Sequence, residues 1–239
     1  MLNLRSSARL FALGAALLTV GCDDDEDLVS PTPTARVRVV NLNPSVTSAG
    51  LFADGSAVGS TVSFGAASAS CIAVPVGKAL QFRAAGQSAQ LVNVSNANIT
   101  ANQPYTIVLY GSAAAPQAAV LSDAGITAPS AGNAAIRFFN ASGTAGDVYL
   151  NASGGALPGT PSAGNLLAGQ ATTGATAFGS YPSANTELRV YNVGNTTIPA
   201  INSTIITANL STGRVGTVFL TNATATGGAN ASVTAAPCS

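Results

Sequence analysis

The side chains that could do acid–base or nucleophilic chemistry are few in this chain. Beyond residue 27 they comprise one lysine and four carboxylates: Lys78, Asp54, Asp123, Asp147 and Glu187. Paired carboxylates can hydrolyse glycosides, and a lysine can activate a serine nucleophile. However, Asp54 precedes Gly55 and Lys78 ends the run 75–78, and both patterns are typical of β-turns. We interpret the carboxylates as turn formers and solvated strand ends, and we predict no catalytic residue.

Other common reaction sites lack a required residue type. The chain has no histidine, so a Ser-His-Asp triad and a histidine-based zinc site are excluded. No glycine loop ends in Gly-Lys-Ser/Thr to cradle a phosphate. No folded loop holds the several carboxylates that calcium needs. We therefore predict no cofactor and no metal site.

Cys22 is the residue whose surroundings point most directly to chemistry. It follows Arg5, Arg9 and an uncharged apolar run at 10–20, which is too short for a membrane span of about 20 residues. The run has the proportions of a signal-peptide core. With the sequence Leu-Thr-Val-Gly-Cys at 18–22, it resembles a bacterial lipoprotein signal, which implies that Cys22 is lipidated. The alternative is an ordinary secretory signal that is cleaved elsewhere.

The segment after Cys22 is typical of an extended tether. Residues 23–27 are all acidic, so they repel one another and stay solvated. Pro31 and Pro33 then lie among serine and threonine, a composition found in extended spacers. We predict a leader at 1–21, a linker at 22–34, and a folded part held by lipid at a membrane of the bacterial cell envelope, outside the cytoplasm.

Cys71 and Cys238 remain once Cys22 is assigned to the lipid. Thiols outside the cytoplasm are more often paired than free, so we predict a disulfide between them. It would tie the C-terminal tail back to the first half of the folded part. The alternative is two independent buried thiols.

Overall composition excludes one class of partner. Only 8% of residues are charged, and removing the leader and the acidic run leaves seven basic and four acidic side chains (9 − 2 and 9 − 5). These charges are scattered, whereas nucleic-acid binding needs lysine and arginine clustered on one face. We predict no nucleic-acid partner.

The sequence predicts an almost entirely β structure. Short apolar runs alternate with polar residues at a period of two, as in Leu80-Gln81-Phe82-Arg83, which favours strands with one solvated face. Turn-forming residues separate the runs. The predicted strands are 36–41, 49–53, 60–64, 70–74, 79–84, 90–94, 105–110, 118–121, 135–140, 147–151, 176–179, 186–191, 198–206 and 217–221.

The strand pattern occurs twice. The run 37–41 matches 136–140, and 50–54 matches 147–151. Many short strands at regular spacing suggest a sandwich or barrel, and about 90–100 residues per copy suits an immunoglobulin-like sandwich. We predict two tandem modules of this kind, at 35–127 and 128–239.

Several runs carry a family resemblance: 35–41, 50–55, 64–65, 74–77 and 105–108, with the opening run reused at 134–140. With these motifs the chain resembles bacterial lipoproteins of the domain-of-unknown-function 4397 family. The resemblance covers most of the chain after the leader. It implies secreted or envelope-anchored β modules and supplies no activity and no catalytic residue.

These observations favour a non-enzymatic envelope lipoprotein with a structural, adhesive or partner-binding role. Its partners would be the membrane, through the lipid anchor, and an unidentified envelope protein or glycan. One alternative is a module that binds polysaccharide or cell-wall glycan through a tyrosine platform drawn from Tyr105, Tyr110, Tyr149, Tyr181 and Tyr191. The other is a carboxylate-based hydrolase.

Overall fold

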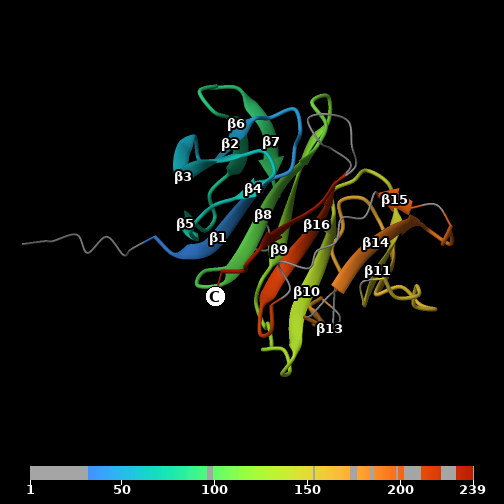
Figure 1. The fold of residues 1–239 in the computed structure, drawn as a ribbon. Helices are drawn as coiled ribbons and strands as arrows, with labels where there is room; N and C mark the ends of the chain where they lie inside the picture. Colours follow the sequence, from blue (N-terminus) through green and yellow to red (C-terminus); the bar gives the residue numbers. More distant parts are fainter. Residues whose placement is uncertain are drawn as a thin grey trace, which may run out of the picture. The chain divides into compact units, whose positions relative to one another are not determined.

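The computed structural model describes residues 32–95, 99–152, 154–172, 177–183, 186–197, 199–201, 211–221 and 230–238. Regular structure in these ranges is entirely β, as the period-two alternation predicts, and residues 32–239 form one compact unit (Figure 1). A search of the same ranges for a helix able to span a bilayer finds none. The predicted leader, Cys22 and most of the linker lie outside the described residues.

The strands fall into two sets, which we call the first and second copy. The first copy holds β1 (Thr34–Asn41), β2 (Ser48–Ala53), β3 (Ser56–Ser63), β4 (Ala66–Ala67), β5 (Ile72–Pro75), β6 (Leu80–Ala84), β7 (Gln90–Val94), β8 (Pro104–Gly111) and β9 (Pro116–Ser122). The second copy holds β10 (Asn133–Asn140), β11 (Gly146–Ala152), β12 (Ala163–Leu166), β13 (Gly179–Pro182), β14 (Thr186–Asn192), β15 (Pro199–Ile201), β16 (Val215–Thr221) and β17 (Asn230–Ala235). The predicted boundary at 127/128 falls between β9 and β10.

Both copies arrange their strands in the same order. In the first copy the inner sheet has the strand order β4-β1-β8-β9, and β5 also pairs with β1. In the second copy the inner sheet has the order β13-β10-β16-β17. The outer sheet has the order β3-β2-β6-β7 in the first copy and β12-β11-β14-β15 in the second. The first strand of each copy pairs in parallel with the penultimate strand, β1 with β8 and β10 with β16, while the other pairings are antiparallel. The sequence match between the copies therefore extends to their topology.

Three apolar clusters define the layering. Within each copy one cluster lies between the inner and outer sheets, around Phe82 in the first copy and Phe138 in the second. A third cluster joins the two inner sheets, because Val40 and Val108 of the first copy pack with Phe139 and Phe219 of the second. The sheets thus stack in four layers, outer–inner–inner–outer, and we call the contact between the inner sheets the seam.

Because of the seam, the inner strands bury both of their faces. Val37 and Val39 of β1 face the first copy's own core, while Val40 faces the second copy. We expected strands with one solvated face, and β6 fits that expectation, since Leu80 and Phe82 are buried while Gln81 and Arg83 are partly exposed. The inner strands instead bury both faces, which accounts for their nearly continuous apolar runs.

Differences from the predicted strands occur where the apolar pattern is weak. We missed β4, β12 and β17, which consist mostly of alanine, serine, asparagine and glycine, residues with low strand propensity. The strand predicted at 176–179 starts only at Gly179, as β13. Of the strand predicted at 198–206, the described part is β15. These segments become strands because they pair with a neighbouring strand, although their sequences have low strand propensity.

Candidate functional site: the seam between the copies

Aromatic side chains fill one part of the seam. Phe139 of β10 is fully buried and contacts the ring of Phe219 with 5.9 Å between centroids. Tyr110 of β8 meets Phe139 edge-on at 5.3 Å, so a side chain from each copy takes part. Burial of such rings, together with edge-to-face geometry, stabilises the contact between the copies.

A buried ion pair crosses the seam next to this cluster. Arg137 of β10 contacts Asp123, which directly follows β9, with 2.6 Å between Nη2 and Oδ1. Their side chains are 3% and 0% exposed. Burial lowers the pKa of Arg137, while the charge of Asp123 and its hydrogen bond to the guanidinium act in the opposite direction. The arginine stays charged because its normal pKa lies far above neutral pH.

Hydrogen bonds from both copies complete this network. Thr106 of β8 donates to Asp123 Oδ2 at 2.7 Å. Arg137 donates through Nε and Nη2 to the hydroxyl of Thr217 on β16, and through Nη1 to the carbonyl of Ser122. The ring of Phe178 lies under the guanidinium, 4.6 Å from its carbon to the ring centroid. Each charge is therefore compensated by several partners, as a buried pair requires.

Asp123 corrects our interpretation of the carboxylates. We expected a solvated strand end, but its side chain is enclosed in the seam. The signal that could have revealed the pair is Arg137 itself, a lone charge within the apolar run 134–139. A charge in such a run needs a compensating partner once both faces of its strand are buried.

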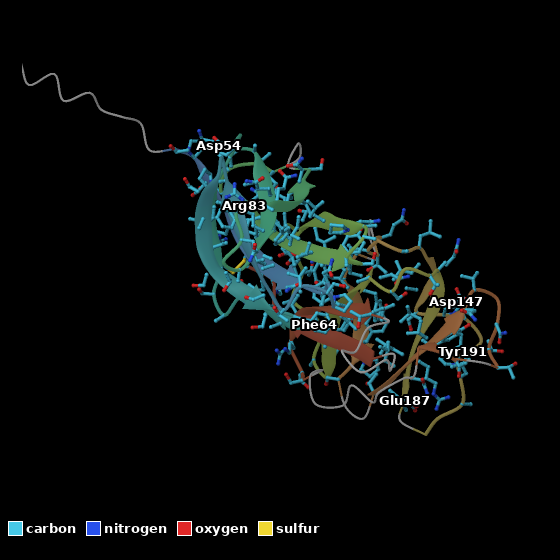
Figure 2. The ribbon with its side chains drawn as sticks, turned by 90° about the horizontal axis from the view of Figure 1, so that it is seen from above. Asp54, Phe64, Arg83, Asp147, Glu187 and Tyr191 are labelled. Atoms are coloured by element: carbon cyan, nitrogen blue, oxygen red, sulfur yellow. A yellow bond between two sulfur atoms is a disulfide. The ribbon has the colours of Figure 1, made fainter. Side chains whose placement is uncertain are left out.

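The other three carboxylates are held in separate places (Figure 2). Asp54 has φ 46° beside Gly55 at φ 84°, the backbone of a two-residue hairpin turn, as its sequence predicts. Its carboxylate contacts Lys78 Nζ at 3.0 Å, and the hydrogen bond with Lys78 is the main cause that lowers its pKa. Lys78 thus lies in a turn and contacts the Asp54 turn.

Asp147 is buried rather than solvated at its strand end. It is 8% exposed and accepts hydrogen bonds from the amides of Asn165 and Gly194 at 2.7 and 2.9 Å, so it links strand β12 to the turn after β14. Glu187 pairs with Arg189, and that hydrogen bond is the main cause that lowers the pKa of Glu187.

The spacing of these carboxylates differs from that of glycosidase pairs. In the ladder between β11 and β14, Asp147 lies opposite Tyr191 and Glu187 lies opposite Asn151. The two carboxylates are therefore four residues apart along the paired strands, about 14 Å at the usual rise per residue. Glycosidase carboxylates lie roughly 5–9.5 Å apart. Asp54 and Asp123 are occupied elsewhere, so the described residues do not favour the hydrolase alternative.

The five tyrosines pack into the fold. Tyr105, Tyr149 and Tyr191 are at most 8% exposed, and Tyr149 stacks edge-on against Tyr191 at 5.7 Å. Tyr110 and Tyr181 are partly buried, stack on Phe139 and Phe138, and have pKa values raised by burial. A sugar platform needs an exposed ring face, so these tyrosines do not favour the glycan alternative.

A disulfide closes the seam at one edge. Cys71, between β4 and β5, bonds Cys238, which follows β17, with 5.8 Å between Cα atoms. Cys238 is 1% exposed, and the guanidinium of Arg38 donates to Cys71 Sγ at 3.5 Å. The bond fastens the tail of the second copy to the first copy, and in Figure 1 the C-terminal end lies beside strands of the first copy.

A cavity of about 620 Å³ opens at the end of the seam. The start of β8, the segment after β9, the start of β16 and the tail that ends in Cys238 line it. Arg36 of β1 completes the lining. Sequence reasoning missed this cavity because its walls come from five separate segments that lie far apart in the chain. No three side chains of the metal-binding types gather within the described ranges.

A buried asparagine fixes the same turn in each copy. The side-chain amide of Asn41 donates to the carbonyls of Val46 and Val62, and its oxygen accepts from the Asn43 amide. Asn140 does the same with Thr144 O, Leu166 O and Ser142 N. Each asparagine ends the first strand of its copy and fixes the turn toward the outer sheet. The repeated Asn in 37–41 and 136–140 is therefore structural.

Comparison with known proteins agrees with the resemblance carried by the first-copy motifs. Residues 35–151 match the family described as Domain of unknown function (DUF4397). The match covers the first copy and continues through β10 and β11, so it includes both partners of the buried ion pair. A search of curated proteins finds no match.

Proposed function

Taking residues 35–151 as a DUF4397 domain, we propose that this protein is a non-enzymatic, lipid-anchored protein of the bacterial envelope with a structural, adhesive or partner-binding role. The observation that carries the proposal is the Cys71–Cys238 disulfide. Such bonds persist in oxidising compartments outside the cytoplasm. In this proposal the leader at 1–21 is removed and Cys22, which follows it, carries the lipid anchor.

The proposed architecture is a pair of immunoglobulin-like sandwiches. Each copy packs two sheets on its own apolar cluster, which is consistent with that class. The seam joins the two sandwiches within one compact unit. A compact pair of this kind on the acidic tether suits a role in holding a partner near the membrane.

Strand addition is the mode of partner binding that the described edges support best. β3 is the edge strand of the first copy's outer sheet, and its eight residues include no charge and no proline. Proteins usually protect such edges with lysine or proline. A groove of about 520 Å³ runs beside β3, lined by 59–63, 66–70 and Ile72 without a charged residue. We propose that an extended, uncharged segment of an envelope protein pairs with β3 there.

Replacing Cys22 with alanine tests the anchor. The variant lacks the thiol that accepts the lipid, so we expect it to lose incorporation of radioactive palmitate and to leave the membrane fraction. One acyl chain holds only marginally and several hold stably, so the shift should be nearly complete. Cys71→Ser/Cys238→Ser, which keeps Cys22 and removes the other two cysteines, is the matched control and should remain labelled. A wild-type chain without label, or a Cys22→Ala chain that stays in the membrane, would refute the anchor.

Cross-linking in intact cells tests the partner. A photoreactive amino acid at Ser60, an exposed position on β3, should give a discrete adduct with one envelope protein. The same amino acid at Val193, which is 48% exposed in the second copy, is the control and should not give that adduct. Identical adducts from both positions, or none from Ser60, would contradict strand addition at β3.

A further inference from the structure

A guanidinium lies against one sulfur of the disulfide that closes the seam. Arg38 of β1 donates through Nη2 to Cys71 Sγ at 3.5 Å and through Nη1 to the carbonyl of Ser68 at 2.6 Å. Its Nε is buried and has no hydrogen-bond partner. None of the salt bridges between described residues includes Arg38. A disulfide sulfur is neutral and accepts only weakly, so the charge of Arg38 has little compensation from these contacts.

Within the described residues, the matching arginine of the second copy has a carboxylate partner and Arg38 has none. Arg137 pairs with Asp123 and also donates to a threonine hydroxyl of β16. Thr106, which lies opposite Arg38 in the parallel ladder, donates its hydroxyl to Asp123. A partly buried cation is stabilised by a nearby anion. A thiolate at the sulfur beside Arg38 would be such an anion, whereas the disulfide is not.

The charged groups around Cys71 favour a thiolate. Cys71 lies between β4 and β5, and both strands pair with β1, whose only charged side chains are Arg36 and Arg38. The sequences of β4, β5, β17 and the tail 236–238 contain no charged residue. The carboxylate of Asp123 is already compensated by its own ion pair. A neighbouring cation lowers the pKa of a cysteine thiol and so increases the share of thiolate, which is the reactive form.

The two sulfur-bearing residues differ in exposure. Cys71 is partly exposed, and the residues on either side of it, Ser70 and Ile72, line the groove beside β3. Cys238 is 1% exposed. Thiol–disulfide exchange depends on access to the sulfur that is attacked, so an incoming thiol reaches Cys71 more readily than Cys238. Cys238 is then the sulfur that leaves during reduction and the sulfur that closes the bond during oxidation.

We propose that Cys71 is a site of thiol–disulfide exchange, that Arg38 stabilises its thiolate, and that a dithiol oxidoreductase of the envelope opens and closes the bond. In reduction, a thiolate of the oxidoreductase bonds to Cys71 Sγ, the bond to Cys238 breaks, and Cys238 leaves as a thiolate that takes up a proton. The second thiolate of the oxidoreductase then bonds to its own partner sulfur and releases Cys71 as a thiolate beside Arg38. The oxidoreductase ends as a disulfide, so two electrons pass from it to this protein. A stabilised thiolate leaves faster in the second step.

Opening the bond has a defined structural consequence. Reduction releases the tail 236–238 from the first copy. That tail is one wall of the cavity at the end of the seam, so the bond acts as a reversible latch on the cavity. This inference rests on the proposed location outside the cytoplasm and goes beyond the proposed function, in which the bond is a fixed link. Tests with purified protein separate the two, since their failure leaves the location unaffected.

Trapping with a thioredoxin whose resolving cysteine is replaced by serine tests which sulfur exchanges. This probe stops after the first step, because it has no second thiol to release itself. We expect a mixed disulfide with the purified full chain that peptide mass spectrometry locates at Cys71. A mixed disulfide located at Cys238, or none at all, would overturn the proposal.

The redox equilibrium of the bond tests the role of Arg38. The purified full chain is equilibrated with mixtures of reduced and oxidised dithiothreitol. Thiols at 71 and 238 are then counted by peptide mass spectrometry after alkylation, so that Cys22 does not contribute. At pH 8, Arg38→Gln should lower the equilibrium constant for reduction about tenfold, because the thiolate loses its cation. Arg38→Lys keeps the charge and should lower it far less. Arg83→Gln, on β6 of the outer sheet, is the matched control and should leave it unchanged.

The pH dependence separates charge stabilisation from a structural effect of the replacement. The thiolate forms only above the pKa of the reduced Cys71 thiol, so the difference between wild type and Arg38→Gln should be present at pH 8 and lost at pH 5. In a Cys238→Ser chain, the rate of alkylation of Cys71 against pH should give a pKa below the ordinary value of about 8.5, and adding Arg38→Gln should raise it. Equal equilibrium constants at pH 8, or a difference that persists undiminished at pH 5, would refute the role of Arg38.

Discussion

Removing the Cys71–Cys238 disulfide should lower the free energy of unfolding by up to about 5 kcal/mol. The bond joins residues 167 positions apart, and in the chain-entropy model a loop of this length restricts the unfolded chain by about that amount. For a chain of this size, such a loss corresponds to a melting temperature lower by roughly 10–20 °C.

The location of the bond adds a local effect. Cys238 follows β17, and Cys71 lies between β4 and β5 on the opposite side of the seam. Without the bond, the tail 236–238 loses its covalent attachment to the first copy. We expect faster amide hydrogen exchange in the tail and at the neighbouring edge of the inner sheet.

The measurement is denaturant and thermal unfolding of the Cys71→Ser/Cys238→Ser double variant beside the wild type, each with and without reductant. The double replacement avoids a lone reactive thiol. Reductant should destabilise the wild type and leave the double variant unchanged, which serves as the control. A difference below about 1 kcal/mol between oxidised wild type and double variant would show that the bond contributes little to the fold.

Breaking the buried ion pair should have an effect of similar size. Asp123→Leu leaves the guanidinium of Arg137 in the seam without its anion, and Arg137→Met leaves the carboxylate of Asp123 without its cation. Removing one partner of a buried pair costs about 3–5 kcal/mol, because the remaining charge is uncompensated. We expect each single variant to lose that much stability.

The double variant Asp123→Leu/Arg137→Met decides the cause of the loss. Apolar replacement of both partners of a buried pair is often close to neutral, so the double variant should regain most of the stability lost in either single variant. Chemical denaturation of all four proteins gives the coupling between the two positions. Losses that simply add would show that packing, rather than charge compensation, determines the result.

The exposed pair of Lys78 and Asp54 is the matched control. Both side chains are about half exposed, at 48% and 49%, and exposed pairs are screened by solvent and contribute little. Lys78→Met should therefore change stability far less than Arg137→Met, although both replacements remove one cation from an ion pair.

Two arginines at matching positions of the repeat show why comparing the two copies in sequence does not reveal the buried ion pair. Arg38 and Arg137 occupy the same place in the repeated run, and each lies opposite a threonine of the parallel strand, Thr106 or Thr217. Arg137 meets Asp123 across the seam, whereas Arg38 donates to Ser68 O and to the sulfur of Cys71. The runs are nearly alike, and the partners come from distant segments that the repeat does not share.

The features that arise from local patterns could be predicted from the amino-acid sequence. Period-two alternation predicted the β class, the repeated runs predicted the duplication, and Asp54 with Gly55 predicted a hairpin turn. These predictions succeed because strand, turn and repeat each depend on residues that are neighbours in the chain.

How the two copies meet depends on contacts between segments that are distant in the sequence. The seam, the burial of Asp123, and the cavity all depend on which face of each inner sheet turns toward the other copy. An apolar run is compatible with one buried face or two, so the sequence leaves that choice open. The packing of the inner sheets determines that both faces are buried, because Phe139 and Phe219 lose their contact with water only when the second copy covers the first.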